Sequence, residues 1–185
     1  MKQMITIGKA TIMNCDCMEY MAGLPDKAFD LAIVDPPYGI DAAKKPISMG
    51  KWKRDIHKSS DWDNSIPDAT YFAELLRVSR NQIIWGGNYF LDYLNNTRCM
   101  IVWDKNNGTN PIHPTQKPVK LYEWLLTNYA KPGQRILDTH LGSMSSVIAA
   151  NNLGFELTGC ELDADYFKAG CARVLQATAQ QRMFP

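Results

Sequence analysis

Four consecutive residues, Asp35-Pro36-Pro37-Tyr38, combine a carboxylate, two prolines and an aromatic ring directly after a short apolar run. Because proline has no N–H group, the backbone there offers carbonyl oxygens as acceptors and few donors. Acceptors beside a flat ring suit a planar amino group, whose two N–H donors can be held against the aromatic face. A simpler interpretation stays open, in which the prolines only make a turn, Asp35 caps a helix and Tyr38 packs in the core.

Two later stretches have features of a nucleoside-binding site. Residues 138–144 run from an expected strand into an expected helix and contain Gly142, which lets a ligand approach the backbone. Glu161 ends the next expected strand, and an acid at about this spacing binds ribose hydroxyls in doubly wound folds. This combination favours an adenosine-bearing ligand. The alternative is ordinary packing of strands and helices, with Ser143 and Asp163 as helix N-caps.

The segment His113-Pro114-Thr115-Gln116-Lys117-Pro118 stands directly before an expected helix. Its two prolines favour an extended backbone that would hold Thr115 and Lys117 in fixed positions. Lys117 would then meet a carboxylate or a phosphate of a ligand. The alternative is a plain lead into the helix, without a ligand.

Basic residues are concentrated in a polar segment that follows Tyr38. Residues 41–60 contain six Lys and Arg residues and two Asp residues, in a chain whose formal net charge is +1. The six basic residues are Lys44, Lys45, Lys51, Lys53, Arg54 and Lys58. Beside a site for an amino group, such a segment is expected to contact nucleic-acid phosphates, and a solvated surface loop is the simpler alternative.

Alternating strand-like and helix-like patterns indicate how these residues are positioned. Short apolar runs predict strands at 4–7, 10–12, 29–34, 82–85, 100–103, 135–138 and 155–160. Helical spacing predicts helices at 16–21, 67–78, 119–129, 143–152 and 163–178, with a short helix ending near residue 94. This alternation predicts one α/β domain over residues 1–185, with a mostly parallel sheet covered on both faces. Asp35, Asp138 and Glu161 then lie at the carboxyl ends of strands, where such sheets bind ligands.

The composition fits one globular domain, since 45% of the 185 residues are hydrophobic. We expect neither a membrane span nor a secretory signal, because no apolar run has the length or flanks of either. The cysteines are Cys15, Cys17, Cys99, Cys160 and Cys171. Their odd number and the absence of a CxxC pair predict buried thiols in a reducing cytoplasm. A metal site that joined Cys15 and Cys17 to His113 and His140 is not expected, because the spacing matches no zinc pattern.

Taken together, the motifs DPPY, HPTQKP and GCELD, with a glycine-containing loop between the last two, resemble the amino-group DNA methyltransferases. These adenine-N6 and cytosine-N4 enzymes use S-adenosylmethionine, and the order with the catalytic motif first resembles their β class. The resemblance covers nearly the whole chain. It implies a Rossmann-like fold with a seven-stranded sheet, double-stranded DNA as partner, no metal, and a cytoplasmic protein of a bacterium or phage. Adenine N6 is favoured as the target, with cytosine N4 as the alternative.

The resemblance also implies roles for single residues. In the catalytic motif, Asp35 and the Pro36 carbonyl would accept hydrogen bonds from the target amino group, while Tyr38 after Pro37 would stack on the flipped base. The implied cofactor-binding residues are Asp16, Cys17, Asp35, Thr115, Lys117, Asp138, Gly142, Ser143, Glu161 and Phe167. Of these, Glu161 would bind the ribose, Asp16 would contact the adenine and Phe167 would pack on the adenine ring.

Two features depart from the family pattern. The family's cofactor loop usually reads Asp-Pro-Phe-x-Gly-Ser-Gly, whereas Met144 stands here where the last glycine is usual. Members of the β class also carry a target-recognition region between the strand ending at Trp103 and His113, but only residues 104–112 lie there. We therefore expect the basic insertion, residues 41–66, to make the main DNA contacts, with little reading of bases.

Other classes of function stay open at this point. An enzyme that methylates a glutamine amide in a protein would normally start the motif with Asn, so Asp35 speaks against it. A non-catalytic remnant that binds cofactor or nucleic acid would keep the cofactor motifs without turnover. The sequence leaves the target site and the biological role open, whether restriction, phage protection or regulation.

Overall fold

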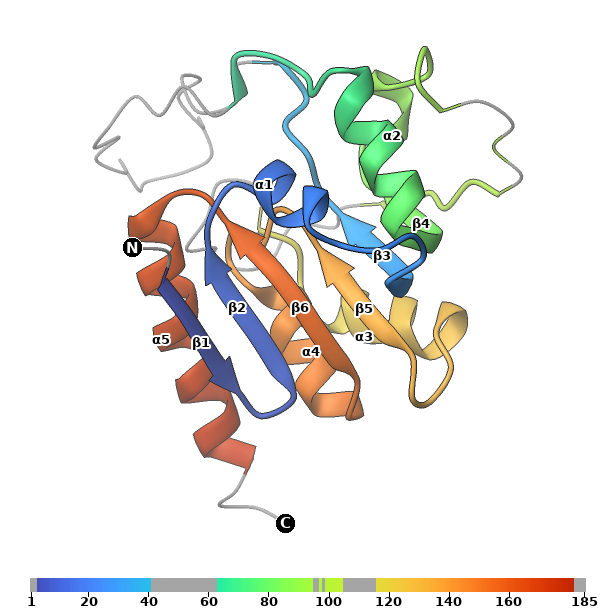
Figure 1. The fold of residues 1–185 in the computed structure, drawn as a ribbon. Helices are drawn as coiled ribbons and strands as arrows, with labels where there is room; N and C mark the ends of the chain where they lie inside the picture. The colour runs from blue at the N-terminus through green and yellow to red at the C-terminus, as the bar shows by residue number, and fades with distance from the viewer. Residues whose placement is uncertain (1–2, 41–62, 95–96, 98, 105–115, 182–185) are drawn as a thin grey trace, which may run out of the picture.

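The computed structural model describes residues 3–40, 63–94, 97, 99–104 and 116–181. Within these residues, one sheet is covered by helices on both faces (Figure 1). The strands are β1 (Gln3–Ile7), β2 (Ala10–Asn14), β3 (Phe29–Val34), β4 (Ser79–Ile84), β5 (Arg135–Asp138) and β6 (Glu156–Glu161). The helices are α1 (Cys17–Ala22), α2 (Ala69–Val78), η2 (Gly87–Tyr89), α3 (Val119–Tyr129), α4 (Ser145–Leu153) and α5 (Ala164–Gln181).

The sheet has the strand order β1-β2-β6-β5-β3-β4. Only β1 runs antiparallel to its neighbour among the described strands, and the other pairs are parallel. The prediction of a mostly parallel α/β sheet is therefore confirmed. Because parallel strands point the same way, the ends of β2, β6, β5 and β3 lie along one edge of the sheet, and their loops meet there.

The described sheet has six strands, one fewer than the seven expected. The missing one is the run Met100–Trp103, which pairs with no described strand. Met100 and Val102 are each 84% exposed, while Trp103 packs edge-on against Trp85 at 6.0 Å between ring centroids. Exposure therefore alternates along this apolar run, but an apolar run does not by itself provide a hydrogen-bonding partner. Cys99, expected to be buried, is exposed.

Strand β3 shows why the sheet is covered on both faces. Leu31 and Ile33 point into one hydrophobic cluster, which also contains residues of α3, α4 and α5. Ala32 and Val34 point into a second cluster, with residues of α2 and Phe90. A strand buried on both faces reads as one continuous apolar run, which is why its sequence predicted a central parallel strand.

Helix boundaries follow their capping residues. The side chain of Asp16 accepts the N–H of Met18 at the start of α1, and Asp163 accepts two N–H groups at the start of α5. Helix α4 begins at Ser145 instead of Ser143, and its N-cap is Met144, whose side chain makes no capping bond. No helix in the described ranges is long and apolar enough to cross a membrane.

Met144, the residue that departs from the family pattern, keeps the backbone conformation of a glycine. Its φ of 58° and ψ of 30° lie in the left-handed region, which costs a non-glycine residue about 1–2 kcal/mol. The side chain is fully buried, and it lies directly over Gly170 of α5. A Cβ atom at position 170 would lie 2.7 Å from the Met144 Sδ atom, so the methionine occupies space that Gly170 leaves open.

The loop after β5 also packs closely on β6. A Cβ atom at Gly159 would lie 2.5 Å from Leu141 Cδ2 and 2.9 Å from the Asp138 carbonyl oxygen. A glycine inside a strand often marks such a close approach by another segment. Gly159 therefore sets how near the 138–144 loop lies to the sheet.

We expect Gly159→Ala to lower the free energy of unfolding by about 1–3 kcal/mol, because the added carbon forces the loop off the strand. Urea unfolding measures this change. Gly23→Ala is the control, since Gly23 has φ −85° and its nearest neighbour to an added Cβ is a carbonyl oxygen at 3.7 Å. If both variants are equally stable, the loop does not depend on the missing side chain at position 159.

Candidate active site

A cavity of about 820 Å³ lies where the loops after β2, β3, β5 and β6 meet. Its volume is in the range of pockets that enclose a cofactor-sized ligand. Five carboxylates and one lysine are among the described residues that line it, so negative charge prevails there. These charged residues are Asp16, Asp35, Asp63, Glu161, Asp163 and Lys117. A positively charged ligand would be favoured in such surroundings.

Asp35 follows the last residue of β3 and faces this cavity together with Pro36, Pro37 and Tyr38. Its Oδ1 atom accepts a hydrogen bond from the Tyr38 hydroxyl. Burial, together with the charge of Asp35, raises the pKa of Tyr38, so this hydroxyl stays protonated and remains a donor. The Tyr38 ring also stacks on Tyr89, at 5.0 Å between centroids and 11° between planes.

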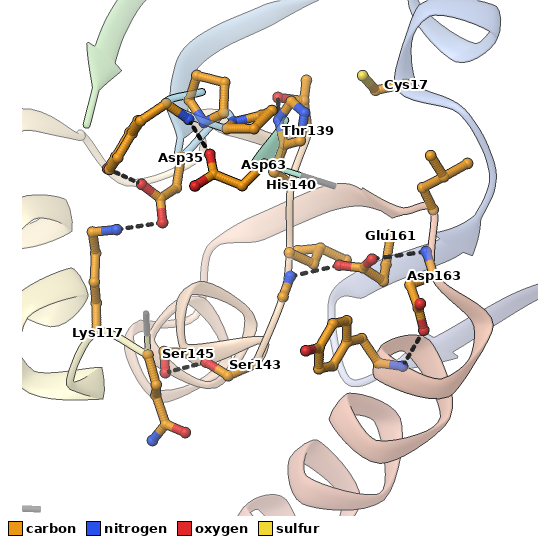
Figure 2. A pocket seen from close by; sticks show the side chains of 18 of the residues that line it. Cys17, Asp35, Asp63, Lys117, Thr139, His140, Ser143, Ser145, Glu161 and Asp163 are labelled. Atoms are coloured by element: carbon orange, nitrogen blue, oxygen red, sulfur yellow. Dashed lines mark hydrogen bonds and ion pairs between the residues drawn. The ribbon is translucent and has the colours of Figure 1, made fainter. Parts of the chain in front are cut away.

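Lys117 forms an ion pair with the other oxygen of Asp35, Oδ2 (Figure 2). The lysine side chain is only 8% exposed, and its Nζ atom lies 5.0 Å from the ring centroid of Trp85. An aromatic face and a carboxylate together compensate a buried ammonium group for lost water. The sequence predicted that Lys117 faces the cofactor, and the structure places its charge against the DPPY carboxylate.

Asp63 holds the backbone that follows Pro37. Its Oδ1 atom accepts the N–H of Tyr38 at 2.7 Å and the N–H of Gly39 at 2.9 Å. The residue is 1% exposed, and it stands 25 positions after Tyr38 in the chain. No local sequence pattern predicts this contact, because its two partners are far apart in the chain.

Glu161, at the end of β6, holds the loop on the opposite side of the cavity. Its Oε2 atom accepts the N–H of Gly142 at 2.7 Å, and its Oε1 atom accepts the N–H of Asp163 at 2.9 Å. Burial raises the pKa of Glu161, while these hydrogen bonds oppose the shift. Each carboxylate oxygen has a second lone pair, so Glu161 can still accept hydroxyl groups from a ligand.

Asp138 lies beneath the loop and outside the set of lining residues. Its side chain accepts hydrogen bonds from the Ser146 hydroxyl at 2.6 Å and from the backbone N–H of His140 at 3.1 Å. Burial raises the pKa of Asp138 to about 7, against the opposing effect of both hydrogen bonds. Burial also lowers the pKa of His140, which does line the cavity, to about 4, so this imidazole is neutral near pH 7.

Asp16 and Cys17 line the cavity at the start of α1. Burial and the charge of Asp16 raise the pKa of the Cys17 thiol to about 12, so this thiol stays protonated and is no nucleophile. Cys15 also lines the cavity, and its Sγ atom lies 3.6 Å from Sγ of Cys160. No three His, Cys, Asp or Glu side chains of the described residues are placed to hold a metal ion.

Most of the predicted site residues therefore meet at one cavity. These are Asp16, Cys17, Asp35, Pro36, Pro37, Tyr38, Lys117, Gly142, Ser143 and Glu161. Phe167 is instead buried in the hydrophobic core, and Tyr166, one position earlier on α5, lines the cavity. Thr115, His113 and the six basic residues of 41–60 lie outside the described residues. The cavity is also lined by Asp63, Leu162 and Tyr166, which were not predicted as site residues. Of the three, only Tyr166 lies on a helix that the sequence pattern predicted.

Comparison with known proteins shows which family this chain resembles. Residues 82–171 match the family model of N6/N4 DNA methylases. Together with the relatives and structures below, this match supports the assignment of the chain to the amino-group DNA methyltransferases. The resemblance in the motifs is thereby confirmed.

Two curated relatives from Escherichia coli strain K12 match parts of the chain. YubD is 36% identical over 74 residues, which are 40% of this chain and 32% of YubD. The DNA adenine methyltransferase YhdJ is 34% identical over 62 residues, which are 34% of this chain and 21% of YhdJ. The chain thus aligns with a third or less of the length of these relatives.

Solved structures confirm the methyltransferase fold over most of the chain. The structure of the M1.HpyAVI–SAM complex has a TM-score of 0.52 at 19% identity, over 89% of this chain and 99% of that one. The cytosine-N4-specific PvuII DNA methyltransferase has a TM-score of 0.56 at 10% identity, over 92% of this chain and 90% of that one. At such identities the likeness concerns the fold.

We expect Asp138→Asn to remove a pH dependence of stability between about pH 4 and pH 7. The pKa of Asp138 is about 7 when folded, while an unfolded Asp has a pKa of about 3.9. The wild-type contribution is therefore fully present below pH 4 and is lost as the pH rises through 7. Between pH 4 and pH 7, the free energy of unfolding of Asp138→Asn should rise relative to that of wild type by about 1.4 kcal/mol for each pKa unit of that shift.

Urea unfolding between pH 4 and 8 measures this difference without cofactor. Ser146→Ala provides a second test, because it removes a hydrogen bond that favours the ionised carboxylate. In Ser146→Ala, the decrease in the free energy of unfolding should therefore extend to a higher pH than in wild type. A stability difference between Asp138→Asn and wild type that does not change with pH would contradict the raised pKa.

Proposed function

We propose that this chain transfers a methyl group from S-adenosylmethionine to the exocyclic amino group of a flipped base in double-stranded DNA. The target we favour is N6 of adenine. One observation carries the proposal: the Asp35-Pro36 acceptors and Glu161 line the same acidic cavity, from different loops. An amino group held at Asp35 and a nucleoside held at Glu161 would therefore lie in one enclosed space.

The residues of the cavity suit S-adenosylmethionine, which the family uses. Glu161, which lines the cavity at the end of β6, would accept two ribose hydroxyls, as an acid does in other doubly wound folds. Asp16, at the α1 N-terminus, would contact the adenine edge, and Gly142 and Ser143 would border the rest of the molecule. The prevailing carboxylates favour a ligand that carries a positive charge. When bound, the cofactor supplies a methyl group on a positively charged sulfur, which is the electrophile of the reaction.

On the DNA side, the chain's own residues would prepare the amine. An exocyclic amine is a poor nucleophile because its lone pair is delocalised into the ring. Asp35 and the Pro36 carbonyl would each accept one of its N–H groups, which favours a pyramidal nitrogen with an available lone pair. Holding this nitrogen in line with the methyl group would supply most of the rate enhancement. As the new N–C bond forms and the sulfur–methyl bond breaks, leaving a neutral thioether, the amine loses one proton, and Asp35 would be the nearby base that accepts it.

Tyr38 and Lys117 would support Asp35 in this role. The Tyr38 hydroxyl and the Lys117 ammonium each donate to one oxygen of the carboxylate, which fixes its orientation. A base placed against the Tyr38 ring would extend an aromatic stack that already includes Tyr89. Lys117 also balances part of the negative charge that the other carboxylates bring to the cavity.

Adenine as the target is supported by the likeness to YhdJ, a DNA adenine methyltransferase. The cytosine-N4-specific PvuII enzyme shares the fold at 10% identity, so its base carries less weight. The six basic residues of 41–60 as DNA contacts remain a prediction, because they lie outside the described residues. The cytoplasmic location also remains a prediction, and the biological role stays open.

The direct test is to incubate the chain with S-adenosylmethionine and DNA from a methylation-deficient host. We expect N6-methyladenine when the DNA is digested to nucleosides and analysed by mass spectrometry. N4-methylcytosine would overturn the choice of adenine and keep the amino-group reaction. Methylation of neither base would overturn the proposed activity.

We expect Asp35→Asn to slow methyl transfer by about 10²–10³-fold, because one acceptor at the amine becomes a donor. Cofactor affinity, measured by calorimetry, should change much less, since Asp35 acts mainly on the transition state. Thermal unfolding checks that the fold survives the loss of the ion pair with Lys117. Turnover near that of the wild type would refute the role of Asp35.

We expect Glu161→Gln to weaken cofactor binding by about 1.5–3 kcal/mol, because the ribose hydroxyls lose a charged acceptor. This corresponds to a dissociation constant roughly 10- to 150-fold higher. Glu156→Gln is the matched control, since Glu156 starts the same strand at the exposed far end. Equal affinities of the two variants would move the ribose site away from β6.

A further inference from the structure

We propose that Asp63 is a positioning residue for methyl transfer, because it fixes the backbone that carries the Asp35-Pro36 acceptors. The inference rests on the function proposed above and adds a residue to it. Asp63 precedes α2 and reaches the catalytic turn from outside the motif (Figure 2). It would act through the backbone of Tyr38 and Gly39, without contact to the reacting atoms.

The turn at 35–39 has few means of holding its own shape. Pro36 and Pro37 have no N–H, so Tyr38 and Gly39 provide the first two donors after Asp35. Both donate to the same oxygen of Asp63, at 2.7 Å and 2.9 Å. These N–H groups lie in the peptide planes of the Pro37 and Tyr38 carbonyls, so Asp63 fixes the direction of both planes. The Pro36 carbonyl, one of the two proposed acceptors, is in the next plane back, and the ring of Pro37 restricts the rotation between the two planes.

Packing alone does not explain why a carboxylate stands at position 63, because burying its charge costs free energy. Asp63 is 1% exposed, and it lies in a cavity that already holds several carboxylates. A buried carboxylate is tolerated when it is hydrogen-bonded, and an apolar residue of similar size would avoid the desolvation cost. What Asp63 provides and an apolar residue cannot is an acceptor for two backbone N–H groups.

Two separate contacts therefore hold the two acceptors. Lys117 and the Tyr38 hydroxyl hold the side chain of Asp35, whereas Asp63 holds the backbone after Pro37. Removing the second contact should leave Asp35 paired with Lys117 while the Pro36 carbonyl loses its fixed direction. The loss should then appear in the rate of the chemical step and leave cofactor binding intact.

The experiment compares Asp63→Ala and Asp63→Asn in single-turnover methyl transfer to DNA at saturating S-adenosylmethionine. Asp63→Ala should slow the step by about 10- to 100-fold, since a misplacement of about 1 Å can have such an effect. The dissociation constant of the cofactor should stay within about threefold of the wild-type value, because Asp63 is proposed to affect the transition state and not the binding of the cofactor. Asp63→Asn should stay within about threefold in rate, because its amide oxygen can accept both N–H groups.

Asp68→Ala is the matched control for stability. Asp68 also accepts two backbone N–H groups with one oxygen, those of Thr70 and Tyr71, at 2.9 Å and 3.2 Å. It caps α2 and does not line the cavity. Its loss should lower the free energy of unfolding without slowing transfer per folded molecule.

Amide hydrogen exchange separates this inference from the proposed function. In Asp63→Ala without DNA, the N–H groups of Tyr38 and Gly39 should exchange faster, while they stay protected in Asp63→Asn and Asp68→Ala. Wild-type transfer rates in Asp63→Ala, or unchanged protection of both amides, would overturn the inference. An inactive wild type would overturn the proposed function, and the exchange pattern would still decide whether Asp63 holds the turn.

Discussion

Carboxylates that accept backbone N–H groups organise the loops at the carboxyl edge of the sheet. Asp63 accepts the N–H groups of Tyr38 and Gly39, and Glu161 accepts one N–H in the loop after β5 and one directly after its own strand. Asp138 binds an amide inside the loop after β5. Loops that leave a parallel sheet bring many unpaired N–H groups to one edge, and acidic side chains satisfy them at short range. The shape of the cavity depends on these contacts.

The same contacts create an electrostatic difficulty, since several negative groups face one space. Hydrogen bonds lower the cost of each charge, and burial still raises the pKa of Asp138 and of Glu161. Lys117 compensates one carboxylate directly, at the place where the amine is proposed to bind. The remaining negative charge is an advantage when the ligand brings a positive one, so the cost in stability and the gain in binding have one origin.

The sequence predicted the features that depend on local pattern. The apolar run before Asp35 predicted a strand buried on both faces, and the prediction of a helix at 119–129 agrees with α3 at both ends. Features that depend on distant partners were not predictable. Met100–Trp103 is an apolar run typical of a strand but has no described strand partner, and Asp63 contacts a turn 25 residues away. Phe167 was predicted to pack on the adenine ring, but it lies in the core, and Tyr166 lines the cavity instead. Successive residues of a helix differ in direction by about 100°, so an error of one position exchanges the two sides.

Met144 and Gly170 limit which residues can replace either of them. The loop has Met144 where the family usually has a glycine, and helix α5 has a glycine, Gly170, directly beneath this methionine. A glycine restored at 144 alone would leave an empty space in the core, and a larger residue at 170 alone would collide with the methionine. Each step alone is therefore disfavoured, so the two positions are expected to change as a pair when related chains diverge.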